Sequence, residues 1–194
     1  AGVTPDPVKF PTFDDGLRAA MKRETELFFE AVMKEDRSVV ELIDADFTYL
    51  NERLAGHYGI DGVSGSAFQR VSLAKGSGRG GILTHASILT ITSNPTRTSP
   101  VNRGKWILEQ ILGTPPPPPP PDVEELEENE EAITSGSLRE RLEKHRAKAE
   151  CATCHSKMDP LGFALENFDG IGAWRDLDGN FPIDPSGELP TGET

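Results

Sequence analysis

Apolar residues recur at intervals of three and four positions along the N-terminal part of the chain. Over residues 17–32 this spacing follows the acidic stretch TFDD, which suits the start of a helix, and it predicts a first helix. A second apolar stripe over residues 38–57 predicts another helix, for which Gly56 or Gly59 provides the stop. The N-terminal region is therefore expected to be helical.

The middle of the chain alternates between loop-forming and apolar stretches. Residues 61–81 are rich in glycine and serine and predict loop around one short strand at 68–73. Residues 82–93, ILTHASILTITS, are ambiguous, because their β-branched side chains favour a strand while their length permits a buried helix. The next helix is predicted to have Ser99 as its N-cap, a proline at its first position and Gly113 as its stop.

A sharp change of composition separates the C-terminal part. Residues 114–135 contain seven consecutive prolines and then six glutamates, which predict a stiff surface spacer rather than an SH3-type ligand. Residues 137–155 then predict a helix that begins with a capping box between Ser137 and Glu140. Four regions follow from these patterns: a helical region at 1–60, a loop, apolar segment and helix at 61–113, a linker at 114–135, and a C-terminal region at 136–194.

Composition and charge exclude several classes of function. The 194 residues carry a formal net charge of −12, which argues against nucleic acid or an anionic membrane surface as a partner. The sequence has no run of roughly 18 or more apolar residues, so we expect no transmembrane segment. No signal peptide is visible, and we expect either that a leader was removed or that the chain is a piece of a longer protein.

Both cysteines and one of the four histidines lie within the pentapeptide CATCH at residues 151–155. Covalent attachment of haem needs two thiols separated by two residues, which add to the two vinyl groups on one edge of the porphyrin. It also needs an imidazole directly after them, which a helical turn carries beneath the iron. Cys151, Cys154 and His155 meet these demands, so we expect one covalent haem c with His155 as the proximal iron ligand.

Three other interpretations of the pentapeptide explain it less directly. A thioredoxin-like dithiol would sit at a strand-to-helix junction, whereas a helix is predicted to lead into this motif. A structural zinc site needs four ligands, and the remaining histidines provide no second pair with suitable spacing. A disulfide across two residues would be strained. The haem site is therefore the favoured interpretation.

The motif and its surroundings resemble a known class of protein. CATCHSKMDPLGFALENFDGIGAWRD, THASILTITSNPTRTSPVNRGKWILEQILGTPPPPPPPDVEEL and ADFTYLNERLAGHYGI are similar to stretches of the large cytochrome-type proteins abundant in planctomycete genomes. The successive regions of those proteins are described only as domains of unknown function. The resemblance covers nearly the whole chain and implies a c-type haem, a periplasmic or extracellular location, and an internal fragment of a multidomain protein.

The second axial position of the iron is less defined than the first. Met158 lies three residues after His155, on the same side of the macrocycle, so we expect it to pack at the ring edge rather than to bind the iron. Pro160 resembles the proline that orients the proximal loop in small cytochromes c. Four residues are candidate distal ligands: His57, His85, Met33 and His145. His57, at a helix end, and His85, in an apolar segment, are the favoured two, His145 is expected to pack or cap its own helix, and an empty sixth position is the alternative.

Haem propionates need cations or hydrogen-bond donors. The stretches NPTRTSPVNRGKW and AWRD supply Arg97, Arg103, Trp174 and Arg175 as candidate propionate contacts. The alternative is that these arginines pair with the many acidic side chains of the chain. The stretch DLDGN at residues 176–180 begins like a calcium loop, but a plain acidic turn is the favoured interpretation.

These inferences together predict a mainly α protein whose helices surround a covalently bound c-type haem, with long irregular loops and a polyproline spacer. The region 136–194 would be the cytochrome c-like haem-binding region. The expected function is electron transfer within a larger secreted or periplasmic redox protein, with a redox partner protein or the remaining domains of a longer chain as partner. The alternatives are a haem peroxidase or oxygenase module with an open distal site, and a non-redox binding module with structural haem.

Overall fold

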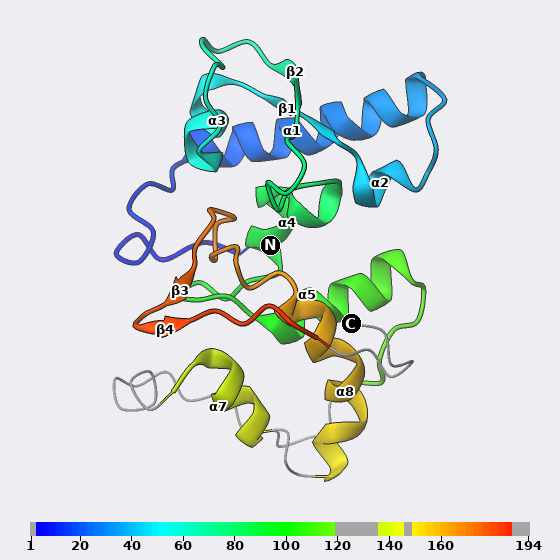
Figure 1. The fold of residues 1–194 in the computed structure, drawn as a ribbon, viewed down its shortest axis with the longest axis vertical. Helices are drawn as coiled ribbons and strands as arrows, with labels where there is room; N and C mark the ends of the chain where they lie inside the picture. The colour runs from blue at the N-terminus through cyan, green and yellow to red at the C-terminus, as the bar shows by residue number, and fades with distance from the viewer. Residues whose placement is uncertain (1–2, 119–135, 146–148, 188–194) are drawn as a thin grey trace. The chain divides into compact units, whose positions relative to one another are not determined.

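The structure, a computed structural model, describes residues 3–118, 136–145 and 149–187. In these ranges the regular elements are mostly helices, with two short antiparallel pairs of strands. In chain order they are α1 (Asp15–Lys34), α2 (Glu41–Asp44), β1 (Phe47–Leu50), α3 (Glu52–Tyr58), β2 (Gln69–Ser72), η1 (Ile82–Thr84), α4 (Ala86–Ile91), α5 (Pro100–Trp106), η2 (Ile107–Ile111), α7 (Leu138–His145), α8 (Ala149–Phe163), β3 (Leu177–Asp178) and β4 (Phe181–Pro182) (Figure 1).

These elements belong to two compact units. Unit 1 comprises Ala1–Arg97 and Phe168–Trp174, and unit 2 comprises Thr98–Asn167 and Arg175–Thr194. Each unit therefore combines stretches that are far apart in the sequence.

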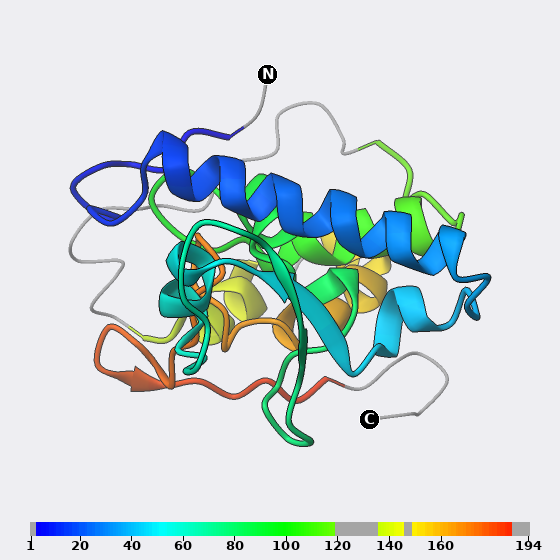
Figure 2. The same ribbon diagram turned by 90° about the horizontal axis from the view of Figure 1, so that it is seen from above.

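Helix α1 provides the central apolar face of unit 1. Asp14 caps it by accepting a hydrogen bond of 2.6 Å from the amide of Leu17. The predicted helix is confirmed, and α2, α3 and β1 lie along it (Figure 2). The residues of α1 that are buried are Leu17, Ala20, Met21, Glu24, Phe28, Ala31 and Val32.

The prediction of one helix over residues 38–57 is wrong. The segment forms α2, then the strand β1, then α3, whose N-cap is Asn51. Strand β1 pairs antiparallel with β2, with Phe47 opposite Ser72. The aromatic and β-branched residues of FTYL suit a strand, and the partner that stabilises this strand lies outside the segment. Of the two predicted stops, Gly56 lies inside α3, and Gly59 ends this helix in the left-handed conformation with φ 68°.

The remaining predictions for unit 1 concern two short segments. Strand β2 confirms the strand predicted at 68–73. The ambiguous segment 82–93 forms the 3₁₀ turn η1 and the helix α4, in which Ala86 and Leu89 are fully buried. Helix α4 packs against α1, so this apolar segment is part of the core of unit 1.

In unit 2, α5 and α8 cross where two glycines allow a close approach. The predicted cap is confirmed, because the Ser99 side chain accepts a hydrogen bond from a backbone amide in the first turn of α5. A Cβ added at Gly104 would overlap the carbonyl oxygen of Met158 in α8, and one added at Gly162 would overlap that of Pro100 in α5. The absence of a side chain at both glycines therefore sets the distance between the two helices.

The helix predicted over residues 137–155 is present as α7 and α8, on either side of residues 146–148, which lie outside the described residues. The predicted capping box is confirmed: the Ser137 hydroxyl accepts from the Glu140 amide at 3.2 Å, and the Glu140 carboxylate accepts from the Ser137 amide at 2.8 Å. Helix α8 continues through Pro160 to Phe163. Pro160 therefore lies inside a helix rather than in a loop after the motif.

Unit 2 also holds the residues around the predicted linker and the acidic stretch 176–180. Residues 119–135, which hold most of the predicted linker, lie outside the described residues, and 114–118 have no regular structure. The acidic stretch 176–180 contains strand β3 and the turn that leads to β4. Gly179 in this turn has φ 61°, and Asp178 pairs with Arg175 at 2.7 Å. Within the described residues, no helix combines the length and apolar character needed to cross a membrane.

Candidate functional site

Helix α8 brings the two thiols and the imidazole of CATCH to one face. Cys151, Cys154 and His155 stand at positions i, i+3 and i+4 of this helix, and side chains with this spacing lie on the same side. Both cysteines are free thiols and are half-buried, as is His155. All three groups are therefore within reach of a planar molecule placed along this face.

A carboxylate one helical turn further along holds the imidazole of His155. Asp159 Oδ1 lies 2.9 Å from His155 Nδ1, and the Asp159 side chain is fully buried. A neutral imidazole donates from one ring nitrogen, and a metal-binding histidine usually donates that hydrogen to a carboxylate, a carbonyl or water. This pair therefore has the form expected when the opposite nitrogen, Nε2, ligates a metal.

The donor groups on this face, two thiols and one imidazole, are those that a covalent haem would need. Among the described residues, no three His, Cys, Asp or Glu side chains are grouped so that they could hold a metal ion, as a structural zinc would require. The element before α8 is the helix α7 rather than a strand, and the two cysteines do not form a disulfide. The porphyrin itself provides four nitrogen ligands to the iron, so the protein would have to provide only one imidazole on this side of it.

The contact between α5 and α8 fixes the backbone of the helix just after the motif. Met158 is 6% exposed, and its carbonyl group lies against Gly104. Asp159 follows it directly and is 0% exposed. The position of the carboxylate that faces His155 is therefore set by helix packing rather than by a mobile surface side chain.

Of the two candidate distal ligands, His57 is hydrogen-bonded to another residue of unit 1. It lies in the last turn of α3, and its Nε2 is 2.8 Å from the carbonyl oxygen of Ile171. A carbonyl only accepts, so this nitrogen carries a hydrogen and donates it. Burial lowers the pKa of His57, which is therefore neutral at pH 7.

The other candidate, His85, is enclosed in the core of unit 1. It is 2% exposed, its Nδ1 lies 3.0 Å from the Thr25 hydroxyl, and Phe28 meets its ring edge-on at 4.9 Å between centroids. Burial lowers its pKa to about 3. Its Nε2 is buried 4.0 Å from Glu24 Oε1. Binding of iron by His85 would require these surroundings to open.

Two of the four candidate propionate contacts are engaged with one buried glutamate in unit 2. Arg103 donates to Glu166 Oε1 at 3.2 Å, and Arg175 donates to Glu166 Oε2 at 3.0 Å. Thr98 also donates to Glu166, at 2.8 Å. Burial raises the pKa of Glu166, while the two arginines oppose that shift. This pairing with an acidic side chain is the alternative weighed for these arginines, and contact with a propionate stays a prediction.

The other two candidates belong to unit 1. Trp174 is 47% exposed, packs edge-on against Phe168 with ring centroids 5.2 Å apart, and covers Gly78. Arg97 is half-buried, and its carbonyl oxygen accepts from the amide of Asn94 at 2.9 Å. Their contact with a haem likewise stays a prediction.

A buried polar cluster in unit 1 was not anticipated from the sequence. Glu24, on α1, is 0% exposed and accepts hydrogen bonds of 2.6 Å from both the Thr48 and the Tyr58 hydroxyl. Tyr58 in turn accepts from the Ala86 amide at 2.8 Å, and Arg79 stacks over its ring at 3.6 Å. Burial raises the pKa of Glu24 from 4.5 to about 7. The only sequence signal was a glutamate within the apolar stripe of α1.

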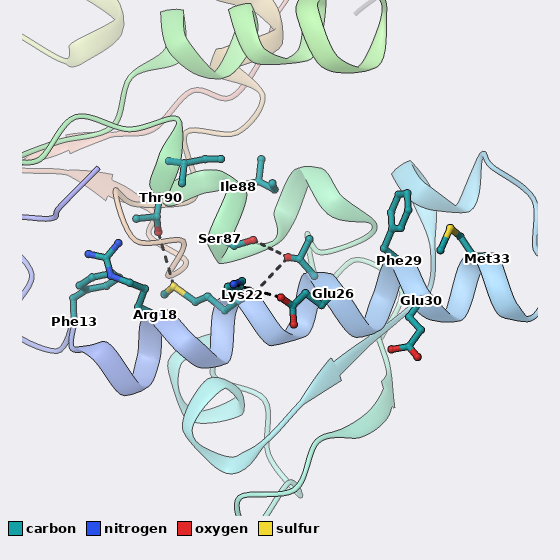
Figure 3. A pocket seen from close by; sticks show the side chains of 13 residues that line it. Phe13, Arg18, Lys22, Glu26, Phe29, Glu30, Met33, Ser87, Ile88 and Thr90 are labelled. Atoms are coloured by element: carbon teal, nitrogen blue, oxygen red, sulfur yellow. Dashed lines mark hydrogen bonds and ion pairs between the residues drawn. The ribbon is translucent and has the colours of Figure 1, made fainter. Parts of the chain in front are cut away.

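A groove of about 670 Å³ lies between α1 and α4 on unit 1 (Figure 3). Phe29, Met33 and Ile88 give it apolar walls. Its polar groups include Thr25 and Ser87, whose hydroxyls are 2.7 Å apart.

Comparison with protein families gives two matches. The PSCyt3 family, described as protein of unknown function (DUF1588), matches residues 79–178, and the PSD4 family, described as protein of unknown function (DUF1592), matches residues 1–60. No curated protein and no solved structure matches the chain. The PSCyt3 match spans more than half of the sequence and includes α5, α8 and the whole CATCH motif, and the chain therefore belongs to the PSCyt3 family.

Proposed function

We propose that this chain is a c-type cytochrome domain that transfers electrons within a larger secreted or periplasmic redox protein. The observation that carries the proposal is the arrangement on α8, where two free thiols and an imidazole share one face and the imidazole is held by Asp159. The resemblance to planctomycete cytochrome-type proteins supports it, as do two successive family matches along one chain.

Each residue of the motif has a separate role in this proposal. The thiols of Cys151 and Cys154 would hold the haem through two thioether bonds to its vinyl groups. His155 would bind the iron through Nε2, and its Nδ1, which lies 2.9 Å from Asp159 Oδ1, would donate its hydrogen to that carboxylate. When bound, the haem supplies a one-electron carrier, and a redox partner protein or another domain of a longer chain gives or takes the electron.

Covalent attachment provides the direct test. The chain is produced in a host that matures c-type cytochromes, then denatured and extracted with acid acetone. Haem is expected to stay with the protein, because thioether bonds survive both treatments. The variant Cys151→Ser with Cys154→Ser is expected to lose it, whereas Thr153→Ala, an exposed position between the cysteines, is expected to keep it. Colour that extracts from the wild-type chain, or haem content unchanged in the double variant, would contradict the proposal.

A second candidate function is a peroxidase or oxygenase module, which needs an open sixth position on the iron. It is favoured by the state of the two candidate distal histidines, since His57 is bonded to a backbone carbonyl and His85 is buried. Optical spectra of the haem-loaded chain separate the two functions. A six-coordinate low-spin iron supports electron transfer, while a high-spin iron that binds carbon monoxide rapidly supports the module with an open site.

A further inference from the structure

Attachment of a haem by the two cysteines does not require the contact between His155 and Asp159. Any carboxylate four residues after a histidine on a helix can reach it, but most such side chains are exposed and change rotamer freely. Asp159 is fully buried, and its oxygen lies 2.9 Å from the ring nitrogen of His155. Because Gly104 lets α5 approach the backbone at Met158, the residue that follows is held in place.

We propose that Asp159 is a positioning residue that orients the His155 ring and lowers the reduction potential of an iron bound to it. The inference rests on the proposed function, because it concerns the ligand of that iron. The group that faces His155 Nδ1 is charged. Asp159 offers a carboxylate to the imidazole, whereas a backbone carbonyl would offer only a neutral dipole.

The direction of the effect follows from the hydrogen bond. A carboxylate that accepts the Nδ1 hydrogen draws positive charge toward itself and increases the electron density on Nε2. A more basic Nε2 stabilises the ferric state more than the ferrous state, since the ferric iron carries the higher charge. The proton remains on Nδ1 throughout, and the only electron that moves is the one exchanged with the redox partner.

The first experiment measures the midpoint potential of the haem-loaded chain with Asp159→Asn, which keeps the shape of the side chain and removes its charge. We expect the ferric–ferrous equilibrium to shift at least about tenfold toward the ferrous state, or about 59 mV for a one-electron couple. The control is Glu109→Gln, which removes one negative charge from a surface ion pair with Lys105 in the same unit. The midpoint potential of Glu109→Gln is expected to shift much less than that of Asp159→Asn. An equal shift in the two variants would overturn the inference.

A second experiment uses the chain without haem and therefore does not depend on the loaded protein. Nitrogen-15 NMR at a pH where His155 is neutral reports which ring nitrogen carries the hydrogen. We expect the hydrogen on Nδ1 in the wild-type chain, and a smaller share there in Asp159→Asn, because the amide is a weaker acceptor than the carboxylate. A wild-type ring that carries its hydrogen on Nε2 would overturn the inference.

The outcomes also separate this inference from the proposed function. A wild-type chain that holds no covalent haem overturns both. A chain that holds haem, but whose potential does not rise in Asp159→Asn, overturns the role of Asp159 alone and leaves the cytochrome function intact. Circular dichroism and thermal unfolding of Asp159→Asn establish that the variant is folded, and a chain that unfolds is replaced by Asp159→Ser, for which the same rise in potential is expected.

Discussion

The hydroxyl of Tyr58 donates a hydrogen bond of 2.6 Å to Glu24 in the core of unit 1, where both side chains are buried. Thr48 donates to the other carboxylate oxygen, and His85 lies 4.0 Å from it. Arg79, stacked on the Tyr58 ring, is the nearby cation, and its charge only partly offsets the burial of the carboxylate. The pair therefore places a titrating carboxyl group inside a folded core.

Replacing Glu24 with glutamine should change how stability depends on pH. Because burial raises the pKa of Glu24 from 4.5 to about 7, the folded state binds a proton that the unfolded state releases between these values. The stability associated with the neutral acid is fully present below pH 4.5 and is lost as pH rises through about 7. The free energy of unfolding of Glu24→Gln, taken relative to that of wild type, should therefore rise by roughly 3 kcal/mol as the pH goes from 4 to 9.

The measurement is urea unfolding of both chains across this pH range. His85 opposes the trend, since its lowered pKa makes acid destabilising. Its pKa of about 3 in the folded state lies below the pH range of the experiment, so its contribution is nearly the same in both chains. Any constant offset from exchanged hydrogen bonds does not alter the slope. A difference between the two chains that is the same at pH 4 and pH 9 would show that Glu24 does not titrate in this window.

Substitution of Gly104 tests the close crossing of α5 and α8. An added Cβ would overlap the carbonyl oxygen of Met158, so we expect Gly104→Ala to destabilise the chain by roughly 1–3 kcal/mol despite the better helix propensity of alanine. Gly56 is the matched control, because it lies within α3 and a Cβ there would meet no atom within 4 Å. Gly56→Ala should raise stability by up to about 1 kcal/mol, and thermal unfolding distinguishes the two signs. Equal stabilisation by both variants would disprove the close packing.

The two candidate distal histidines can be separated by stability and spectrum together. His85→Ala removes a core side chain and its contact with Phe28, and should destabilise the chain by roughly 2 kcal/mol or more. His57→Ala removes one hydrogen bond to Ile171 and should cost about 1 kcal/mol. Because both rings are engaged within unit 1, we expect neither variant to alter the ferric spectrum of the haem-loaded chain. A shift toward high spin in either one would identify that histidine as the sixth ligand.

The ion pairs of Glu166 should matter more than any surface pair. Glu166→Gln removes the negative charge next to Arg103, which is 1% exposed, and we expect a loss of roughly 3–5 kcal/mol. Glu109→Gln breaks a partly exposed pair with Lys105 and should change stability by less than about 1 kcal/mol. Chemical denaturation of the two variants gives the comparison. A small loss of stability in Glu166→Gln would mean that the other hydrogen bonds of Arg103, such as the one to the Leu165 carbonyl, are enough to stabilise its buried charge.

The sequence alone determined the features that depend on neighbours within a few residues. The apolar stripe of α1, the cap at Ser99 and the reciprocal bonds of Ser137 and Glu140 were all predicted, because each involves side chains no more than one or two helical turns apart. The common helix face of Cys151, Cys154 and His155 belongs to the same class, since spacing in the sequence decides it.

Only the tertiary structure decided the features that join distant parts of the chain. Strand β1 was predicted as helix, because its apolar spacing suits both and only pairing of Phe47 with Ser72 distinguishes them. The burial of Glu24 likewise depends on Thr48 and Tyr58, which come from other elements. Asp159 lies between the two cases: its spacing from His155 is local, but its burial comes from the packing of α5 on α8. Burial requires partners from elsewhere in the chain, and a pattern within one segment does not reveal which partners those are.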